Sequence, residues 1–225
     1  MGFCSTIDLL LASARLANSI ARLPSAANKE SSHDRLLDGA AEEFAAAGFA
    51  GARIDRIARR TKLNVRMIYY HFGSKKGLYR AVLQSIYEQM SHILDELPVA
   101  ASGEQQTLEA IGRYFDLLIE HPRFADVLVR ELLDGAKHLK SLWKERPELF
   151  RQIHYHARKL IESGIAAGEL RDLDPAMTVL SVTSIVCFLT AARHSHALFL
   201  DERRSQPQTW KQHLMTLLLD GLRAR

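Results

Sequence analysis

The stretch that decides the fold runs from Arg53 to Tyr79 and reads RIDRIARRTKLNVRMIYYHFGSKKGLY. Its pattern predicts two short helices joined by a tight turn, then a loop with adjacent lysines and the start of a longer helix. Residues 50–80 carry nine Lys or Arg against one acid, whereas the whole chain has 30 basic and 26 acidic residues, so the remainder is net acidic. A basic block interleaved with aromatic residues is expected of a surface that meets nucleic-acid phosphates.

Composition places the chain among soluble globular proteins. Its 225 residues, 47% hydrophobic and 25% charged, can bury a substantial core in one large or two modest domains. Cys4 and Cys187 lie far apart and form no disulfide framework or zinc spacing, so we expect reduced thiols in a cytoplasmic protein. The longest apolar-rich stretch, 177–192, carries several Ser and Thr, which predicts a buried bundle helix and no membrane span.

Residues 1–32 form an N-terminal extension with its own character. An amphipathic helix is possible over residues 7–23, and residues 24–32 (PSAANKESS) predict a flexible linker. The segment superficially resembles a targeting peptide but lacks a positively charged start and a clear cleavage site. Two interpretations stay open, a poorly ordered extension and a short helical arm that assists binding.

From Ser31 onward the apolar spacing is helical almost throughout, with no convincing strand pattern. We therefore predict an all-α protein with a three-helix helix-turn-helix head at 33–79 and a larger helical-bundle body at 80–225. The expected helices of the head and the first helix of the body span 34–47, 54–61, 65–72 and about 75–97. The other expected helices of the body span 104–120, 122–139, 147–168, 174–194 and 207–223.

The second helix of a helix-turn-helix lies in the major groove, with its N-terminal residues at the base edges. Here that helix begins at Asn64, so Arg66 could donate two hydrogen bonds to a guanine, and Val65 or Met67 could meet a thymine methyl group. Polar and aromatic residues further along suit phosphate contact. The predicted DNA-contacting residues are Arg53, Asn64, Val65, Arg66, Met67, Tyr69, Tyr70, His71 and Lys75.

The segment from about Arg35 to Tyr79 resembles the DNA-binding domain of tetracycline-repressor (TetR) family regulators. The resemblance rests on the progression Ala41, Phe44, Gly48, on the pair Ile57–Ala58, and above all on IYYHFGSKKGLY at 68–79. It implies phosphate-contacting roles for Tyr69 and Lys75. In a bacterial cell such a protein would be cytoplasmic and associated with the nucleoid.

Two departures from the family pattern concern the turn and the recognition helix. Lys62 replaces the usual turn glycine, so a left-handed backbone there would cost about 1 kcal/mol. Arg66 and Met67 stand where family members often carry Gly and Thr or Ser. Arg66 could read a base directly or only reach a phosphate, which leaves the operator sequence open.

The resemblance also implies that the body forms a homodimer through its last two long helices and holds a small-molecule effector between the others. The predicted interface residues are Ser184, Phe188, Ala191, Trp210, Leu214, Leu217 and Leu218. Closure of the protomer's own core is the other explanation for these apolar stripes. The candidate effector-pocket residues are Tyr87, Met90, Phe115, Phe124, Leu128, Trp143 and His154. Taken singly, each of them is better explained by core packing, and the sequence does not identify the effector.

Other chemistry finds little support in the sequence. In 154–156 and 194–196 two histidines stand two residues apart, which on a helix points them about 200° away from each other, so we predict no metal site. No nucleophile with an adjacent base, phosphate-cradling glycine loop or catalytic carboxylate pair is evident, so we expect neither an enzyme nor a cofactor. The predicted function is a repressor released from a palindromic operator by a small molecule. The alternative is a DNA-binding architectural or adaptor protein that needs no effector.

Overall fold

The computed structural model describes residues 31–97 and 102–224, and nearly all of them are helical. The helices are α2 (Ser32–Gly51), α3 (Ile54–Thr61), α4 (Val65–Phe72), α5 (Lys75–Asp95), α6 (Gly103–Glu120), α7 (Pro122–Leu133), α8 (Lys137–Glu145), α9 (Pro147–Ala166), α10 (Pro175–Ala191), the 3₁₀ helix η1 (Ala192–Leu198) and α11 (Pro207–Leu222). In these two ranges the β-pairing amounts to an isolated bridge between Leu170 and Arg223. The prediction of an all-α protein is confirmed. The predicted N-terminal arm falls almost wholly outside the described residues.

Short polar side chains fix the starts of several helices. The Asn64 side chain accepts the backbone N–H of Arg66 and caps α4, and the Ser74 hydroxyl accepts the N–H of Gly77 and caps α5. Ser102 and Gln105 form a complete capping box at α6. These bonds satisfy backbone donors that have no partner within the helix. The predicted bounds of α4, 65–72, are therefore confirmed.

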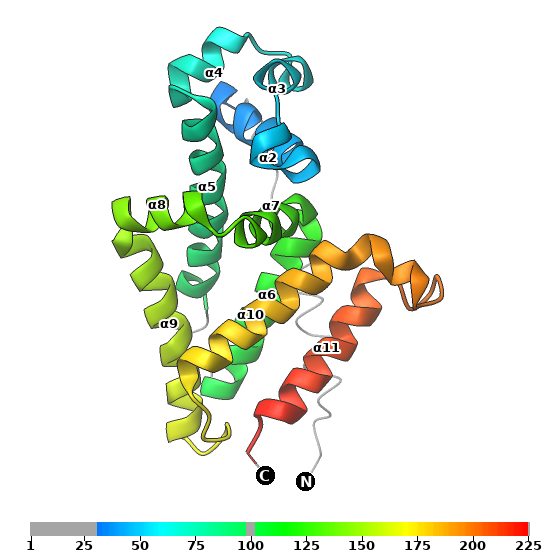
Figure 1. Ribbon diagram of the computed structural model, residues 1–225. Helices are drawn as coiled ribbons and strands as arrows, with labels where there is room; N and C mark the ends of the chain where they lie inside the picture. The colour runs from blue at the N-terminus through cyan, green and yellow to red at the C-terminus, as the bar shows by residue number, and fades with distance from the viewer. Residues whose placement is uncertain (1–30, 98–101, 225) are drawn as a thin grey trace, which may run out of the picture. The chain divides into compact units, whose positions relative to one another are not determined.

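The head consists of α2, α3 and α4 packed on the first turns of α5 (Figure 1). Its core contains side chains with no exposed surface, namely Leu36, Ala40, Ile57, Ile68 and Leu78. A Cβ atom at Gly77 would overlap the carbonyl oxygen of Phe72, so α4 can approach α5 this closely only because residue 77 is glycine.

Helix α5 leaves the head and continues into the body, where it packs against α6, α8 and α9 (Figure 1). The most extensive packing between head and body joins α2 to α7. Within the body, α6 packs on α9, and α10 lies across α6, α7 and α9. Helix α11 packs mainly on α6. Since α5 belongs to both parts, a tilt of α5 moves the head.

The prediction of one helix over 122–139 was wrong. Helix α7 ends at Leu133, and Gly135 and Ala136 take positive φ angles of 83° and 55°, which turn the chain before α8 begins. The buried Glu131 carboxylate accepts the backbone N–H groups of His138 and Leu139 and so caps α8. Apolar spacing continues through this corner, which hid the break, although Gly135 marked it.

Helix α10 lies partly buried, contrary to the expectation of a buried helix. Pro175–His196 is the one segment of the described residues long and apolar enough to cross a bilayer, with a mean hydropathy of 1.8. Core helices meet the same criterion, and α10 buries Val182, Val186 and Cys187 against its neighbours. Its other side exposes apolar residues, including Phe188 at 63% exposure.

Candidate nucleic-acid interface

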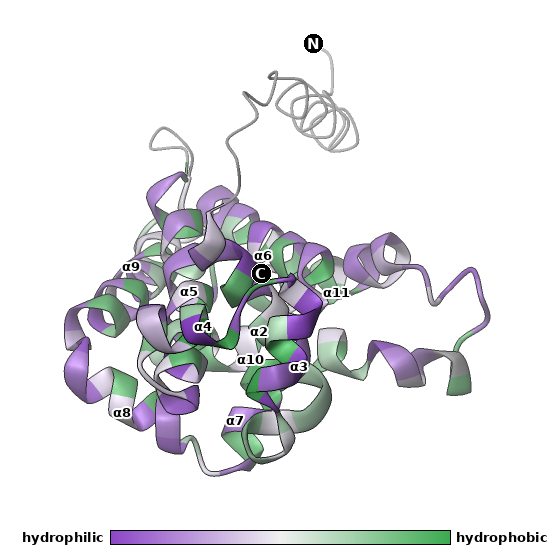
Figure 2. Ribbon diagram, turned by 90° about the horizontal axis from the view of Figure 1, so that it is seen from above, coloured by the Kyte–Doolittle hydropathy of each residue, from purple (hydrophilic) through white to green (hydrophobic). Residues whose placement is uncertain are grey.

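Helix α4 projects from the head with its polar and aromatic side chains outward. Ile68 is completely buried and anchors the helix, while Arg66, Tyr69, Tyr70 and His71 are exposed, Tyr70 at 82%. Seen from above the head (Figure 2), α4 carries hydrophilic and hydrophobic residues side by side. Exposed aromatic rings beside a cation fit a surface that meets another molecule better than they fit a solvated helix face.

Val65 and Met67 are less exposed than Arg66. Both side chains are half-buried and pack against the hydrophobic core of the head. Only part of each side chain is available for a thymine methyl group, whereas Arg66 is exposed. Arg66 is therefore the side chain of the first turn best placed to reach a base edge.

The turn before α4 has the left-handed backbone expected for the family's glycine. Lys62 has φ 54° and ψ 34°, and its N–H bonds to carbonyl oxygens of the last turn of α3. The N–H of Leu63 bonds to the carbonyl oxygen of Ala58 at 3.1 Å. The turn is thus retained with a lysine in a strained conformation, and the long Lys62 side chain is exposed beside α4.

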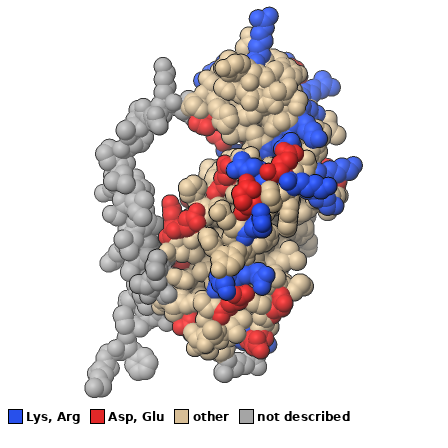
Figure 3. Space-filling view, turned by 90° about the vertical axis from the view of Figure 1, so that its left-hand side faces the viewer, with Lys and Arg blue, Asp and Glu red and all other residues tan. Residues whose placement is uncertain are grey.

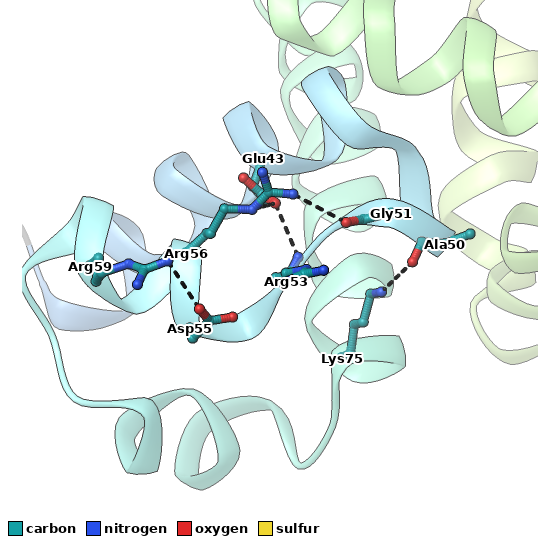
Figure 4. A network of polar contacts seen from close by, with 8 residues as sticks. All are labelled: Glu43, Ala50, Gly51, Arg53, Asp55, Arg56, Arg59 and Lys75. Carbon is teal, nitrogen blue, oxygen red and sulfur yellow. Dashed lines mark hydrogen bonds and ion pairs between the residues drawn. The ribbon is translucent and has the colours of Figure 1, made fainter.

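Helix α3 is held in place by a buried carboxylate on α2 (Figure 4). Glu43 is 3% exposed, accepts the backbone N–H of Arg53 at 3.0 Å, and forms an ion pair with Nε of Arg56 at 2.9 Å. The same arginine donates to the carbonyl oxygen of Gly51. Glu43 therefore joins α2 to the start of α3. The local sequence does not signal this role, because adjacent glutamates on a helix are usually solvated.

Seven cations of the head fall into two groups. Arg56, Arg59 and Arg60 form ion pairs with Glu43, Asp55 and Glu42 respectively. The side chains of Arg53, Lys62, Arg66 and Lys76 are exposed and make no hydrogen bond or ion pair with residues 31–97 or 102–224. On the face shown in Figure 3, Lys and Arg side chains project from the head end of the molecule. The second group supplies cations that need not break an existing pair to meet a phosphate.

Lys75, a predicted phosphate contact, is partly engaged within the head. Its ammonium group donates to the carbonyl oxygen of Ala50 at 3.1 Å and lies 5.0 Å from the centre of the Phe49 ring (Figure 4). The neighbouring Lys76 is exposed. Lys62 and Lys76 were not among the predicted contacts, and their position beside α4 and at the start of α5 makes them further candidates.

Three of the predicted effector-pocket residues come together around a residue that the sequence analysis did not single out. The Phe150 ring lies 4.6 Å from Tyr87 and 5.4 Å from Trp143, whose ring lies 6.0 Å from His154. Burial raises the pKa of Tyr87 to about 12. Trp143 and His154 are exposed at the outer edge of this cluster, whereas Tyr87 lies deeper.

The other predicted pocket residues lie elsewhere in the body core. Phe115 is completely buried and contacts Trp210 at 4.7 Å, Phe124 and Leu128 are buried on α7, and Met90 is half-buried. Tyr114 and Cys187, which the sequence analysis did not place in a pocket, share a hydrogen bond, and burial raises the pKa of the Cys187 thiol to about 11. In the two described ranges no group of three or more His, Cys, Asp or Glu residues could hold a metal ion.

Some of the predicted dimer residues are exposed, and others are buried within the protomer. Ser184, Phe188 and Leu217 are exposed, and Ala191 and Leu218 are half-buried. Leu214, in contrast, is buried within the protomer, because this side of α11 faces α6. Trp210 is half-buried and contacts His196 as well as Phe115.

Two sequence families match the two parts of the chain. Residues 36–82 match "Bacterial regulatory proteins, tetR family", and residues 105–218 match "Tetracyclin repressor-like, C-terminal domain". Both matches fall on the elements described above, α2 to α5 and α6 to α11.

Characterised relatives resemble the chain over most of their length. The HTH-type transcriptional repressor NicS of Pseudomonas putida is 33% identical over 196 residues, which is 84% of this chain and 92% of that protein. The HTH-type transcriptional repressor SCO4008 of Streptomyces coelicolor is 33% identical over 159 residues, 69% of this chain and 76% of its own.

A solved structure shares the fold. A bacterial regulatory protein of the tetR family from Rhodococcus RHA1 superimposes with a TM-score of 0.69 at 18% identity, covering 86% of this chain and 98% of that one. The family matches, the relatives and the geometry of α4 agree, and the chain belongs to the tetracycline repressor (TetR) family of bacterial transcriptional regulators.

Proposed function

We propose that this chain is a homodimeric repressor that binds a palindromic DNA operator and leaves it when a small molecule binds in the body. The observation that carries the proposal is the exposure of Arg66, Tyr69 and Tyr70 on a capped, projecting α4. The relatives NicS and SCO4008, both named as repressors, support repression over activation.

In the proposed complex, α4 lies in the major groove. Asn64 and Arg66 at its N-terminal end face base edges, while Tyr69, His71 and Lys75 meet phosphates. The exposed cations Arg53, Lys62 and Lys76 add phosphate contacts around the groove. Each neutralised phosphate releases condensed counterions, so affinity should fall steeply with salt.

The exposed apolar side of α10 and α11 would join two protomers. Met177, Leu180 and Phe188 on α10 and Leu217 on α11 are each more than half exposed. Two such helices and their copies form a four-helix interface around a two-fold axis. That symmetry would set two heads on successive major grooves, about 34 to 36 Å apart.

A small molecule would act by binding one arrangement of the heads better than another. The cluster of Tyr87, Phe150 and Trp143, with Tyr114 and Cys187 deeper in the body, offers aromatic rings, hydroxyl groups and a thiol to such a ligand. The Tyr87 hydroxyl and the Cys187 thiol are neutral at physiological pH, and burial raises the pKa of each further above that pH.

The test is selection of bound sequences from a random duplex pool with the purified protein. We expect enrichment of an inverted repeat whose half-sites are one helical turn, about 10 base pairs, or a multiple of it apart. Arg158→Ala is a matched control, because it removes an exposed body arginine that pairs with Glu162 on its own helix. Binding without sequence preference would favour an architectural protein, and absence of binding at low salt would contradict both functions.

A further inference from the structure

The corner between α7 and α8 meets the head at a cluster of five buried or half-buried residues, which we call the Glu131 joint. It comprises Glu131 and His138 of the body and Phe49, Lys75 and Tyr79 of the head. The two body residues flank the left-handed turn at Gly135 and Ala136, and the three head residues come from the end of α2 and the start of α5.

Glu131 organises the body side of the joint. Its side chain is 2% exposed, and one carboxylate oxygen accepts the backbone N–H groups of His138 at 2.7 Å and Leu139 at 2.9 Å. The other oxygen lies 3.1 Å from Nδ1 of His138. This distance is that of a hydrogen bond between the two side chains, which an ionised carboxylate would accept from the ring N–H. Both the start of α8 and the orientation of the imidazole therefore depend on one side chain.

His138 contacts two aromatic residues of the head. Its ring lies 4.2 Å from the ring of Phe49 and 4.9 Å from that of Tyr79, and the Phe49 and Tyr79 rings lie 5.2 Å apart. Burial and the Glu131 carboxylate, to which the hydroxyl also hydrogen-bonds, raise the pKa of Tyr79. Three rings from three helices thus pack against one another beside a hydrogen-bonded carboxylate, with the Tyr79 and His138 rings edge to face and the other two pairs tilted.

The contacts continue to a residue expected at the DNA. The ammonium group of Lys75 lies 5.0 Å from the centre of the Phe49 ring and donates to the carbonyl oxygen of Ala50. A shift of α7 or α8 would therefore move Phe49 and the start of α5 together. Arg80 of α5, which pairs with Glu145 at the end of α8, adds a second link along the same helices.

We infer that the Glu131 joint fixes the tilt of the head on the body and so sets the separation of the two heads in the dimer. Glu131 and His138 are positioning residues that do not touch DNA. The inference rests on the proposed function. It identifies the Glu131 joint as the contact through which a conformational change in the body would alter the tilt of the heads. A packed chain of contacts of this kind needs a measured coupling to establish it.

Operator spacing reports the rigidity of the joint. The operator enriched from the random pool would be compared, by fluorescence anisotropy, with versions that have one base pair added or removed between the half-sites. A dimer with rigidly held heads should lose affinity by about fivefold or more on these altered operators. Glu131→Gln and His138→Ala should reduce that loss to about twofold or less, with affinity for the natural spacing within about threefold of the unmodified protein.

The choice of variants distinguishes a loss of head orientation from a loss of folding stability. In Glu131→Gln the amide oxygen can still cap α8, while the amide nitrogen donates where the carboxylate accepted. His138 must then change tautomer to keep its hydrogen bond, and the negative charge of the joint is lost. His138→Phe keeps the ring and should retain more of the spacing loss than His138→Ala. Glu148→Gln is the control, because Glu148 is an exposed carboxylate whose side chain pairs with Arg146.

Two results would overturn the inference. One is a spacing loss unchanged in Glu131→Gln and His138→Ala. The other is an affinity loss equal at every spacing with a lowered melting temperature, which marks destabilisation alone. If the pool yields no inverted repeat, the proposed function itself fails. If the pool yields an inverted repeat and the variants lose affinity on altered spacing as much as the unmodified protein does, only the inference about the joint fails.

Discussion

Helices α4 and α10 both keep large side chains in solvent, but the chemistry of the two surfaces differs. The exposed residues of α4 include two aromatic rings with hydroxyl groups, Tyr69 and Tyr70, and the cation Arg66. Along α10 they are Met177, Leu180 and Phe188, with no Lys, Arg, Asp or Glu anywhere in the helix. The first surface suits a charged, hydrated partner, and the second suits a partner that excludes water.

The difference shows that exposure alone does not identify a partner. An apolar row gains free energy when a similar row covers it, roughly 25 cal/mol for each Å² removed from water. A basic and aromatic surface gains little from such burial and instead exchanges counterions and hydrogen bonds. Four substitutions test whether α10 forms the dimer interface and the head binds DNA. The largest effect is expected at α10.

Phe188→Asp should convert the dimer into a monomer. A carboxylate in the centre of an apolar interface has no partner, and an unpaired buried charge costs about 3–5 kcal/mol. Sedimentation velocity should show the mass of one chain, and operator affinity should fall because the two heads are no longer linked. Leu133→Asp is the control, since Leu133 is 82% exposed at the C-terminal end of α7 and belongs to neither α10 nor α11. A stable Phe188→Asp dimer would remove α10 from the interface.

Arg66→Ala should relax base preference at one position of each half-site. A bidentate arginine–guanine contact contributes about 1–3 kcal/mol of discrimination, which repeated selection from the random pool would measure. Arg59→Ala is the control, since that arginine already pairs with Asp55. Equal weakening on every sequence would mean that Arg66 only holds a phosphate.

Lys75→Ala should weaken binding to all sequences and reduce the log–log salt dependence by about one unit. Its present bond to the carbonyl oxygen of Ala50 is weaker than a bond to a charged phosphate would be. The comparison variant is Lys76→Ala, measured in the same salt series. If only Lys76→Ala changes the slope, the phosphate contact belongs to Lys76, and Lys75 serves the head's structure.

Lys62→Gly should stabilise the fold by about 0.5–1 kcal/mol, because glycine adopts a positive φ without the strain of a Cβ atom. The body contains the same situation at Ala136, with φ 55° against 54° at Lys62, so Ala136→Gly should give a similar gain. Urea denaturation would measure both. Lys62→Ala keeps the strain and should give no gain, and a gain there would show that the charge of Lys62, rather than its backbone, is unfavourable.

The head could be predicted closely because its structure depends on local chemistry. Asn64, Ser74 and Gly73 mark the ends of α4 and the start of α5 within a few residues, and Ile68 fixes which side of α4 turns inward. The periodicity of α7 gave no such guide. There the chain breaks at Gly135, and the helix that follows is capped by Glu131, which precedes it by several residues and whose burial the local sequence does not indicate.

The sequence by itself determined the helical class, the basic recognition helix and the apolar faces of the last two long helices, because spacing, capping residues and charge act over a few positions. Only the tertiary structure decided that Glu43 and Glu131 are buried, that Leu214 turns into the protomer, and that Lys75 rests on Phe49. Those outcomes depend on which helices meet. The free energy of burying a carboxylate is set by donors that neighbouring segments supply, and a single stretch of sequence does not contain that information.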